Sequence, residues 1–442
     1  MINREQDYVF PKDFLWGTAT SAHQVEGDNF NSDWWQWEEK MKGRVLPVAE
    51  KKYQNKKFVP SGKACDHYYR YEEDFDLLEK MGNNSYRLSI EWARLEPKPG
   101  LFDEQQLNHY QQVLKDLKRR NIKVMLTLNH FTLPNWLALH GGWTSFKAPY
   151  YFTRYVTYIA KTLGQLVDLW ITINEPEIYI DMCYLKGFWP PQKKDIKKAV
   201  LAYLNMARAH KKTYKLLHQT LDRPEKKVQV GFAMNVMSFA SYKKHNFWEL
   251  FYVHAADRII NHSFYDLTKK THDFLGVNYY FRVRLKQAEN SLLPTQDEVK
   301  EEESELTDMG WVVYPHGIFD VLMDFKDFNL PIYITENGIA TEHDEQRVNF
   351  IINHLVEIHH AISAGVDVRG YYHWSLLDNY EWDKGFGPKF GLVAVDHRSQ
   401  IRTPKISYYI YQKICKKNCI SKDLMKKICQ NNTITKELIK KL

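Results

Sequence analysis

The segment LWITINEP at residues 169–176 carries a strong structural signal. Its apolar, β-branched run predicts a buried strand, and Pro176 predicts that the strand stops just after Glu175. A second segment of the same build, IYITENG at residues 332–338, ends in Glu336 and Asn337. Each segment therefore places a carboxylate beside an amide at the C-terminal end of a predicted strand.

Six further runs of this kind occur along the chain, and amphipathic helical stretches such as 68–81 and 103–120 separate the runs. Eight β/α units in one chain predict the α/β class and a single (β/α)8 TIM barrel, with the active site at the C-terminal ends of the strands. An open doubly wound sheet is the rival fold, but no G-x-G-x-x-G motif follows the first run. The eight predicted strands are Phe14–Ala19, Ser85–Ile90, Lys123–Leu128, Leu169–Ile173, Val228–Ala233, Phe274–Tyr279, Ile332–Thr335 and Val368–Trp374.

Composition narrows the class of protein. The 442 residues are 44% hydrophobic and 26% charged, which excludes a disordered chain, and the mean hydropathy of −0.53 argues against a membrane span. Residues 402–442 hold 11 Lys and Arg against 2 Asp and Glu, a charge of +9, so residues 1–401 sum to −2 within the net charge of +7. We expect a barrel over residues 1–413, a basic C-terminal extension over 414–442 and no nucleic-acid partner.

The compartment and the metal content are also expectations from sequence. The chain starts without an apolar signal segment and has an odd number of cysteines, five, which favours reduced thiols and a cytoplasmic location. The extension holds Cys415, Cys419 and Cys429, but it lacks the second Cys pair or the His that zinc would require. We therefore predict no metal and no cofactor. Isoleucines and leucines at 434–442 have helical spacing and predict a docked or partly disordered helix.

Glu175 and Glu336 end the fourth and seventh predicted strands, so they can meet across the mouth of a closed barrel. Glycoside hydrolysis needs such a carboxyl pair, one as proton donor and one as nucleophile or base. A single Glu after a strand more often caps a helix or pairs with an arginine. The paired occurrence, with an amide beside each carboxylate, favours the catalytic interpretation.

The chain resembles glycoside hydrolase family 1, the retaining β-glycosidases, over about residues 8–412. Six separated motifs carry the resemblance, in family order: FLWGTATSAHQVEG at 14–27, SYRLSIEW at 85–92, Asn-Glu-Pro at 174–176, DFLGVNYY at 273–280, Thr-Glu-Asn-Gly at 335–338 and WSLLDNYEW at 374–382. The resemblance implies that Glu175 is the acid/base and Glu336 the nucleophile. It also implies that Arg87 and Tyr280 keep Glu336 ionised, with Asn278 as a supporting residue.

The resemblance further implies a sugar-binding set. Hydrogen-bonding and aromatic positions of the family match Gln24, His130, Asn174, Trp374, Glu381, Trp382 and Phe390. Relatives that act on 6-phospho sugars carry a Ser/Lys/Tyr set where this chain has Glu381. A carboxylate there would repel a phosphate, so we expect a non-phosphorylated sugar.

The predicted function is a retaining β-glycosidase that acts on terminal β-D-glucosides, with β-galactosides and β-fucosides as further candidates. Alternatives are a non-catalytic carbohydrate- or receptor-binding module on the same fold, or a transglycosidase. The chain departs from the family in a shortened connection, residues 259–272, which puts the outer wall of the barrel there in doubt. The sequence leaves the oligomeric state open.

Overall fold

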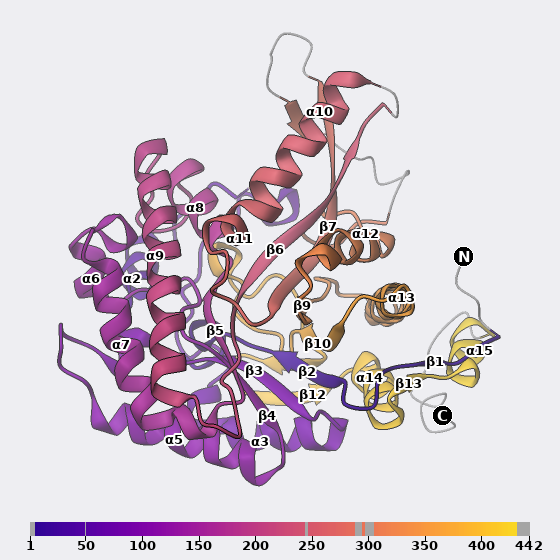
Figure 1. The fold of residues 1–442 in the computed structure, drawn as a ribbon, viewed down its shortest axis with the longest axis horizontal. Helices are drawn as coiled ribbons and strands as arrows, with labels where there is room; N and C mark the ends of the chain where they lie inside the picture. The colour runs from indigo at the N-terminus through magenta and orange to yellow at the C-terminus, as the bar shows by residue number, and fades with distance from the viewer. Residues whose placement is uncertain (1–4, 49, 244–245, 288–293, 297–304, 431–442) are drawn as a thin grey trace.

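A computed structural model describes residues 5–48, 50–243, 246–287, 294–296 and 305–430 of the chain. Eight parallel strands hydrogen-bond in the order β6-β5-β4-β3-β2-β10-β9-β7, and β6 also pairs with β7, so the sheet closes into a barrel (Figure 1). The (β/α)8 prediction is confirmed. The barrel strands are β2 (Leu15–Ala19), β3 (Ser85–Ser89), β4 (Lys123–Thr127), β5 (Leu169–Asn174), β6 (Val230–Ser241), β7 (Leu275–Gln287), β9 (Ile332–Asn337) and β10 (Val368–Trp374).

A helix follows each strand and packs outside the barrel. The two helices predicted by periodicity are confirmed as α3 and α5, and Asp103 caps α5 by accepting hydrogen bonds from the N–H groups of Gln105 and Gln106. The outer helices are α3 (His67–Met81), α5 (Glu104–Arg119), α7 (Ala148–Leu163), α9 (Ile196–Leu221), α10 (Phe247–Ala256), α12 (His316–Phe325), α13 (Asp344–Ser363) and α14 (Ile406–Lys417). Short helices in the connections are α1 (Ala22–Val25), α2 (Asp33–Met41), α4 (Trp92–Leu95), α6 (Asn135–Leu139), α8 (Pro176–Ile180) and α11 (Ser263–Leu267).

The apolar side chains form two main cores. The larger one lies between the strands and the surrounding helices. The second fills the barrel itself, where side chains from different strands meet, as in other barrels of this kind. Its members include Leu15, Met125, Leu169, Ile171, Phe274, Tyr333 and Tyr372.

β6 and β7 extend well past the ends predicted for them, residues 233 and 279. Beyond the barrel rim they stay paired from Ser238 and Arg282 to Ser241 and Leu285. The short β8 (Pro294–Gln296) adds to β7, and α10 packs on the ribbon through Tyr252. We call these extended strands, with β8 and α10, the arm; it projects from the barrel in Figure 1.

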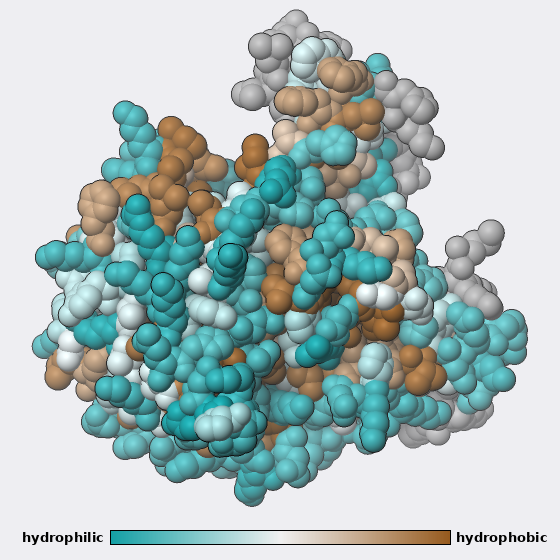
Figure 2. Space-filling view, in the orientation of Figure 1, coloured by the Kyte–Doolittle hydropathy of each residue, from teal (hydrophilic) through white to brown (hydrophobic). Residues whose placement is uncertain are grey.

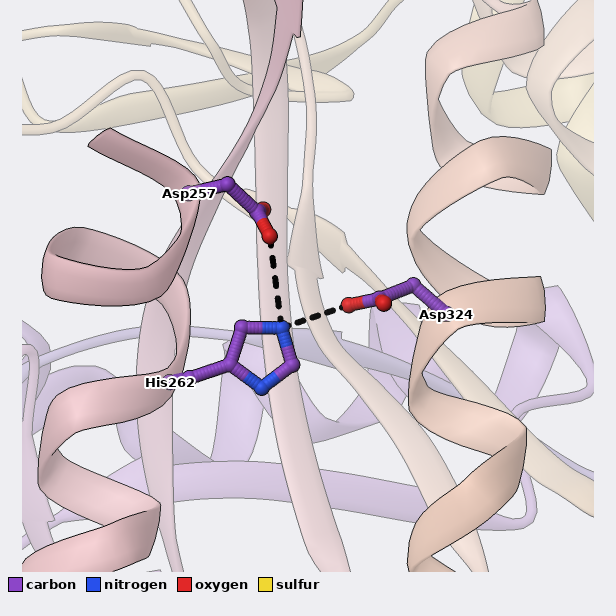
Figure 3. A group of neighbouring side chains, drawn as sticks. All are labelled: Asp257, His262 and Asp324. Carbon is purple, nitrogen blue, oxygen red and sulfur yellow. Dashed lines mark hydrogen bonds and ion pairs between the residues drawn. The ribbon is translucent and has the colours of Figure 1, made fainter. Parts of the chain in front are cut away.

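The shortened connection at residues 259–272 still closes the outer wall. It forms one π-helical stretch, η5 (Asp257–His262), followed by α11, and Phe264 and Tyr265 bury their rings against the barrel. His262 ties η5 to α12: its Nε2 lies 2.6 Å from Asp324 and 3.5 Å from Asp257 (Figure 3). These ion pairs raise the pKa of His262. The imidazole nitrogen itself occupies the space between the two carboxylates.

The expected boundary at residue 413 falls inside α14, so the start of the extension belongs to the barrel body. Ile414 and Cys415 are buried, because one face of α14 packs against α3 and α13. Residues Cys419–Ile420 form β13, which pairs with β1 (Tyr8–Val9), and α15 (Lys422–Gln430) follows. The helix predicted at 434–442 lies outside the described residues.

Candidate active site

Glu175 occupies a turn that the local sequence enforces. β5 ends at Asn174, and Pro176 opens α8, where its fixed φ suits the first helical position. Glu175 between them has φ +43°, a left-handed conformation that non-glycine residues rarely adopt. Strained residues of this kind cluster at active sites, where the surrounding structure holds them in place.

Glu336 lies one residue before the end of β9, and β6 and β7 separate this strand from β5 in the barrel. The backbone after it runs against β10. A Cβ atom on Gly338 would lie 1.8 Å from the carbonyl oxygen of Trp374, so only glycine fits there. The Thr-Glu-Asn-Gly motif thus contains both Glu336, a catalytic candidate, and Gly338, whose close contact with β10 fixes the loop after Glu336.

Glu336 is held by a cation and a phenol. Arg87 donates from Nη1 to Glu336 Oε1 at 2.5 Å, and the Tyr280 hydroxyl donates to Oε2 at 2.5 Å. All three side chains are buried. Burial raises the pKa of Glu336, while Arg87 and Tyr280 oppose that rise because both stabilise the carboxylate.

Glu175 contacts neutral amides instead. Asn278 Nδ2 donates to Glu175 Oε1 at 2.8 Å, and Asn235 Nδ2 donates to the same oxygen at 3.2 Å. Thr335 donates to Asn278 Oδ1 at 2.6 Å, which turns the amide nitrogen of Asn278 toward Glu175. Burial, and then the charge of Glu336, raise the pKa of Glu175 to about 8.

The two carboxyl groups therefore titrate in a fixed order. The negative charge of Glu336 is itself a cause of the raised pKa of Glu175, so Glu336 is already ionised when Glu175 loses its proton. The contacts of Arg87 and Tyr280 thus favour a carboxylate on Glu336, and the surroundings of Glu175 favour a carboxylic acid. This is the protonation state that a nucleophile and a proton donor need.

Gln24 and Glu381, two residues of the sugar-binding set, form a hydrogen bond at the rim of the barrel. Gln24 accepts a hydrogen bond from Ser21 through Oε1, and its Nε2 donates to Glu381 Oε2 at 3.2 Å. Burial raises the pKa of Glu381 to about 8, with Lys384 opposing the rise. Glu381 is therefore mostly protonated at neutral pH, whereas the sequence predicts a carboxylate there.

His130 contacts both the aromatic residues of the site and Asn174, which precedes Glu175. Its ring lies nearly parallel to Trp374, with centroids 5.9 Å apart, and to Trp382 at 6.1 Å. Its Nε2 accepts a hydrogen bond from Asn174 at 3.2 Å, and burial beside Arg87 keeps its pKa well below the usual value. A neutral ring that accepts at Nε2 carries its proton on Nδ1, which has no partner among the described residues.

The structure brings the whole predicted set together at the C-terminal ends of the strands. Arg87 bridges the two halves, because its Nη2 also donates to Asn174 Oδ1 at 2.5 Å. Phe390 reaches the set through Tyr280, with ring centroids 6.2 Å apart. Eleven of the twelve predicted side chains are buried and Glu381 is partly exposed; the buried ones are Gln24, Arg87, His130, Asn174, Glu175, Asn278, Tyr280, Glu336, Trp374, Trp382 and Phe390.

Sequence reasoning missed two residues next to Glu175. Asn235 lies on β6, two residues beyond the predicted strand end, where a polar residue after an apolar run was the available signal. Glu177 accepts a hydrogen bond from the backbone N–H of Asn235 at 2.6 Å, and its Oε2 is buried without a partner among the described residues. Burial, and then the charge of Glu175, raise the pKa of Glu177 well above its usual value. No motif in the sequence marks Glu177.

Known proteins share this architecture over nearly their full length. A 1,4-beta-D-glucan glucohydrolase of Thermotoga neapolitana is 32% identical, and the match covers 92% of this chain and 98% of that protein. The solved structure of a beta-glycosidase from Pyrococcus horikoshii is 37% identical with a TM-score of 0.86, covering 96% and 99%. The beta-glucosidase from Thermotoga maritima in complex with deoxynojirimycin is 29% identical with a TM-score of 0.84, covering 93% and 99%.

The family model for "Glycosyl hydrolase family 1" matches residues 6–268 and 255–420. Its two matches overlap at residues 255–268, a range that includes most of the shortened connection. Together they cover almost every described residue, including all twelve members of the predicted site. The chain belongs to glycosyl hydrolase family 1 and is a glycoside hydrolase.

Proposed function

We propose that the protein hydrolyses terminal, non-reducing β-D-glucosides by double displacement, with β-galactosides and β-fucosides as further substrates. One observation carries the proposal. The two buried carboxyl groups have opposite surroundings: Arg87 and Tyr280 stabilise charge on Glu336, while Glu175 has only neutral amides and a negative neighbour. That difference assigns the role of nucleophile to Glu336 and the role of proton donor to Glu175.

In the first step Glu336 attacks the anomeric carbon and Glu175 protonates the departing glycosidic oxygen. Both observed amide hydrogen bonds go to Oε1 of Glu175, which leaves Oε2 to carry the proton. The products are a free aglycone and a sugar bound covalently to Glu336.

In the second step Glu175 acts as a base instead of an acid. The ester no longer places a negative charge on Glu336, so the pKa of Glu175 falls and the group is ionised when water enters. Glu175 takes a proton from that water, whose oxygen attacks the anomeric carbon and releases Glu336. Two inversions leave the sugar in the β configuration.

The sugar itself is proposed to lie between the polar and aromatic residues of the rim. Gln24 and Glu381 supply hydrogen-bond donors and acceptors to neighbouring hydroxyls, and the proton on His130 Nδ1 supplies another. Trp374 offers an apolar face to the ring. These assignments rest on the placement of the side chains and on the family pattern.

A glycoside panel with stereochemical analysis tests the proposal. Aryl β-D-glucoside, β-D-galactoside, β-D-fucoside and α-D-glucoside would be compared, and the first product would be followed by proton NMR. We expect release from the β-glucoside and initial β product, because two successive inversions at the anomeric carbon restore the β configuration. Initial α product, or a preference for the α-glucoside, would refute the double-displacement assignment.

A further inference from the structure

We propose that the protein docks on an anionic phospholipid surface through two exposed patches on the mouth side of the barrel. One patch is apolar and lies on the arm. The other combines apolar and lysine side chains at the start of α9. Among the described residues no helix combines the length and apolar composition needed to cross a bilayer, so the contact would be with the surface alone.

The arm patch consists of large apolar side chains that α10 and its N-terminal turn expose. The most exposed is Phe247 at 72%, followed by Phe251 at 55% and Trp248 at 50%. Leu250 and Tyr242 complete the patch. Figure 2 shows brown side chains gathered at this end of the molecule.

α10 is apolar on both its inward and its outward face. Its inward face carries Tyr252, Val253 and Ala256, which pack on the ribbon, and the buried Glu249, which accepts hydrogen bonds from the N–H groups of Lys243 and Gln287. Its outward face carries the phenylalanines, where a helix of a soluble protein normally carries polar residues. These exposed apolar side chains indicate a surface that something apolar covers.

The second patch, which we call the α9 patch, lies across the rim from the arm. Its apolar members are Leu139, Leu185, Ile196 and Val200, all of them exposed. Ile196 and Val200 stand one turn apart on α9. Figure 2 shows a second brown area over the α6–α8 side of the molecule.

Lysines surround the α9 patch. Lys186, Lys193, Lys194, Lys197 and Lys198 are exposed, and residues 181–200 contain only two carboxylates, Asp181 and Asp195. Asp195 uses one oxygen to cap α9, where it accepts from the N–H groups of Lys197 and Lys198. This excess of positive charge beside apolar side chains matches the phosphates and acyl chains of an anionic lipid surface.

Both patches belong to connections that leave the C-terminal ends of the barrel strands. α6 follows β4, α9 follows β5, and the arm continues β6 and β7. Docking would therefore turn the catalytic mouth toward the lipid. The sequence after β8 is acidic at residues 297–305, so we assign recognition of lipid charge to the α9 patch and apolar insertion to the arm patch.

Vesicle co-sedimentation with the full chain tests both assignments. The probes are vesicles of phosphatidylcholine alone and of phosphatidylcholine with phosphatidylglycerol at 7:3. We expect the wild type to bind the mixed vesicles at least tenfold more tightly. The variant F247S/W248S/F251S should lose at least tenfold on both vesicles. The variant K193Q/K194Q/K197Q should lose the preference for the mixed vesicles.

Controls separate docking from damage to the fold. All variants should hydrolyse a soluble aryl β-glucoside at the wild-type rate, because none of the changed residues lies in the catalytic set. Ile401→Ser, an exposed apolar residue outside both patches, should bind as the wild type does. Absence of wild-type binding to mixed vesicles, or equal binding by the arm variant, would overturn the proposal. So would a dimer in buffer that the arm variant dissociates, since a second copy would then cover the arm patch.

Discussion

Arg87 lies 2.5 Å from Glu336 and fixes the charge at the centre of the site. The same guanidinium reaches Asn174, so one buried cation connects the proposed nucleophile to the residue before the proposed acid. Because the cation is buried, its attraction for the carboxylate is weakly screened by solvent. The charge of Glu336 in turn raises the pKa of Glu175, so the chemistry of Glu336 and the titration of Glu175 are coupled.

Glu336→Ala should lower kcat by about 10⁴-fold or more, because the variant lacks the group that forms the covalent bond. Azide or formate should restore turnover of an activated aryl glucoside and give α product. Glu342→Ala, which removes an exposed carboxylate, is the matched control and should retain full activity. Near wild-type turnover by Glu336→Ala would contradict the nucleophile assignment.

Glu175→Gln should separate substrates by their leaving group. The variant cannot donate a proton, so the first step should slow far more for alkyl glucosides than for aryl glucosides with acidic phenols. Comparing kcat/KM for a series of leaving groups measures this split. An equal loss for both classes would mean that Glu175 has a structural role.

The pKa of Glu175 should fall when the charge on Glu336 is removed. Burial, and then the charge of Glu336, raise the pKa of Glu175 to about 8, so activity should decline as the pH rises through about 8 and Glu175 loses its proton. Carbon-13 NMR of labelled glutamate should show a lower Glu175 pKa in Glu336→Gln than in the wild type. An unchanged pKa would show that burial alone sets it.

Glu177 should act as a positioning residue through Asn235. Glu177→Gln keeps an acceptor for the Asn235 N–H, so its pH profile should match the wild type, whereas Glu177→Ala should shift the alkaline limb. The pKa of Glu177 is raised in the folded chain, so stability is lost as the pH rises above the unfolded value. Glutamine does not ionise, so Glu177→Gln should not lose this stability. The Tm of the variant should therefore exceed that of the wild type by an amount that grows from about pH 5 to pH 8. Equal pH profiles for both variants would refute the positioning role.

Much of the barrel could be predicted because buried parallel strands appear in sequence as short continuous apolar runs. Six of the eight strands begin within one residue of the run that predicts them and end within two residues of it. The arm could not be predicted in this way. Residues 238–241 leave the barrel, and the pairing that sustains them comes from β7, more than 40 residues later.

Glu175 and Glu336 could be predicted from the two strand ends that carry them, but the other ten site residues depended on the family resemblance, since a lone Trp or His after a strand is usually structural. Glu177 had no such motif, and its role depends on a backbone N–H of β6.

The sequence of α10 predicts a helix but not which of its side chains are exposed. Its sequence, FWELFYVHAA, is that of a core helix, and only the structure shows that its phenylalanines face outward.

Glu381 should make the enzyme discriminate against 6-phospho sugars. Its pKa of about 8 means that the group is mostly protonated at neutral pH, so the repulsion is weaker there than a full carboxylate would give. Two unit charges about 4 Å apart interact by roughly 4 kcal/mol at an effective dielectric near 20. When Glu381 ionises, a repulsion of this order acts between its carboxylate and the 6-phosphate. The preference for aryl β-D-glucoside over its 6-phosphate should therefore increase as the pH rises from about 6 to about 9. Glu381→Gln should keep the preference constant with pH. The measurement is kcat/KM for both substrates across that range. A preference that does not change with pH in the wild type would mean that shape, and not the charge of Glu381, excludes the phosphate.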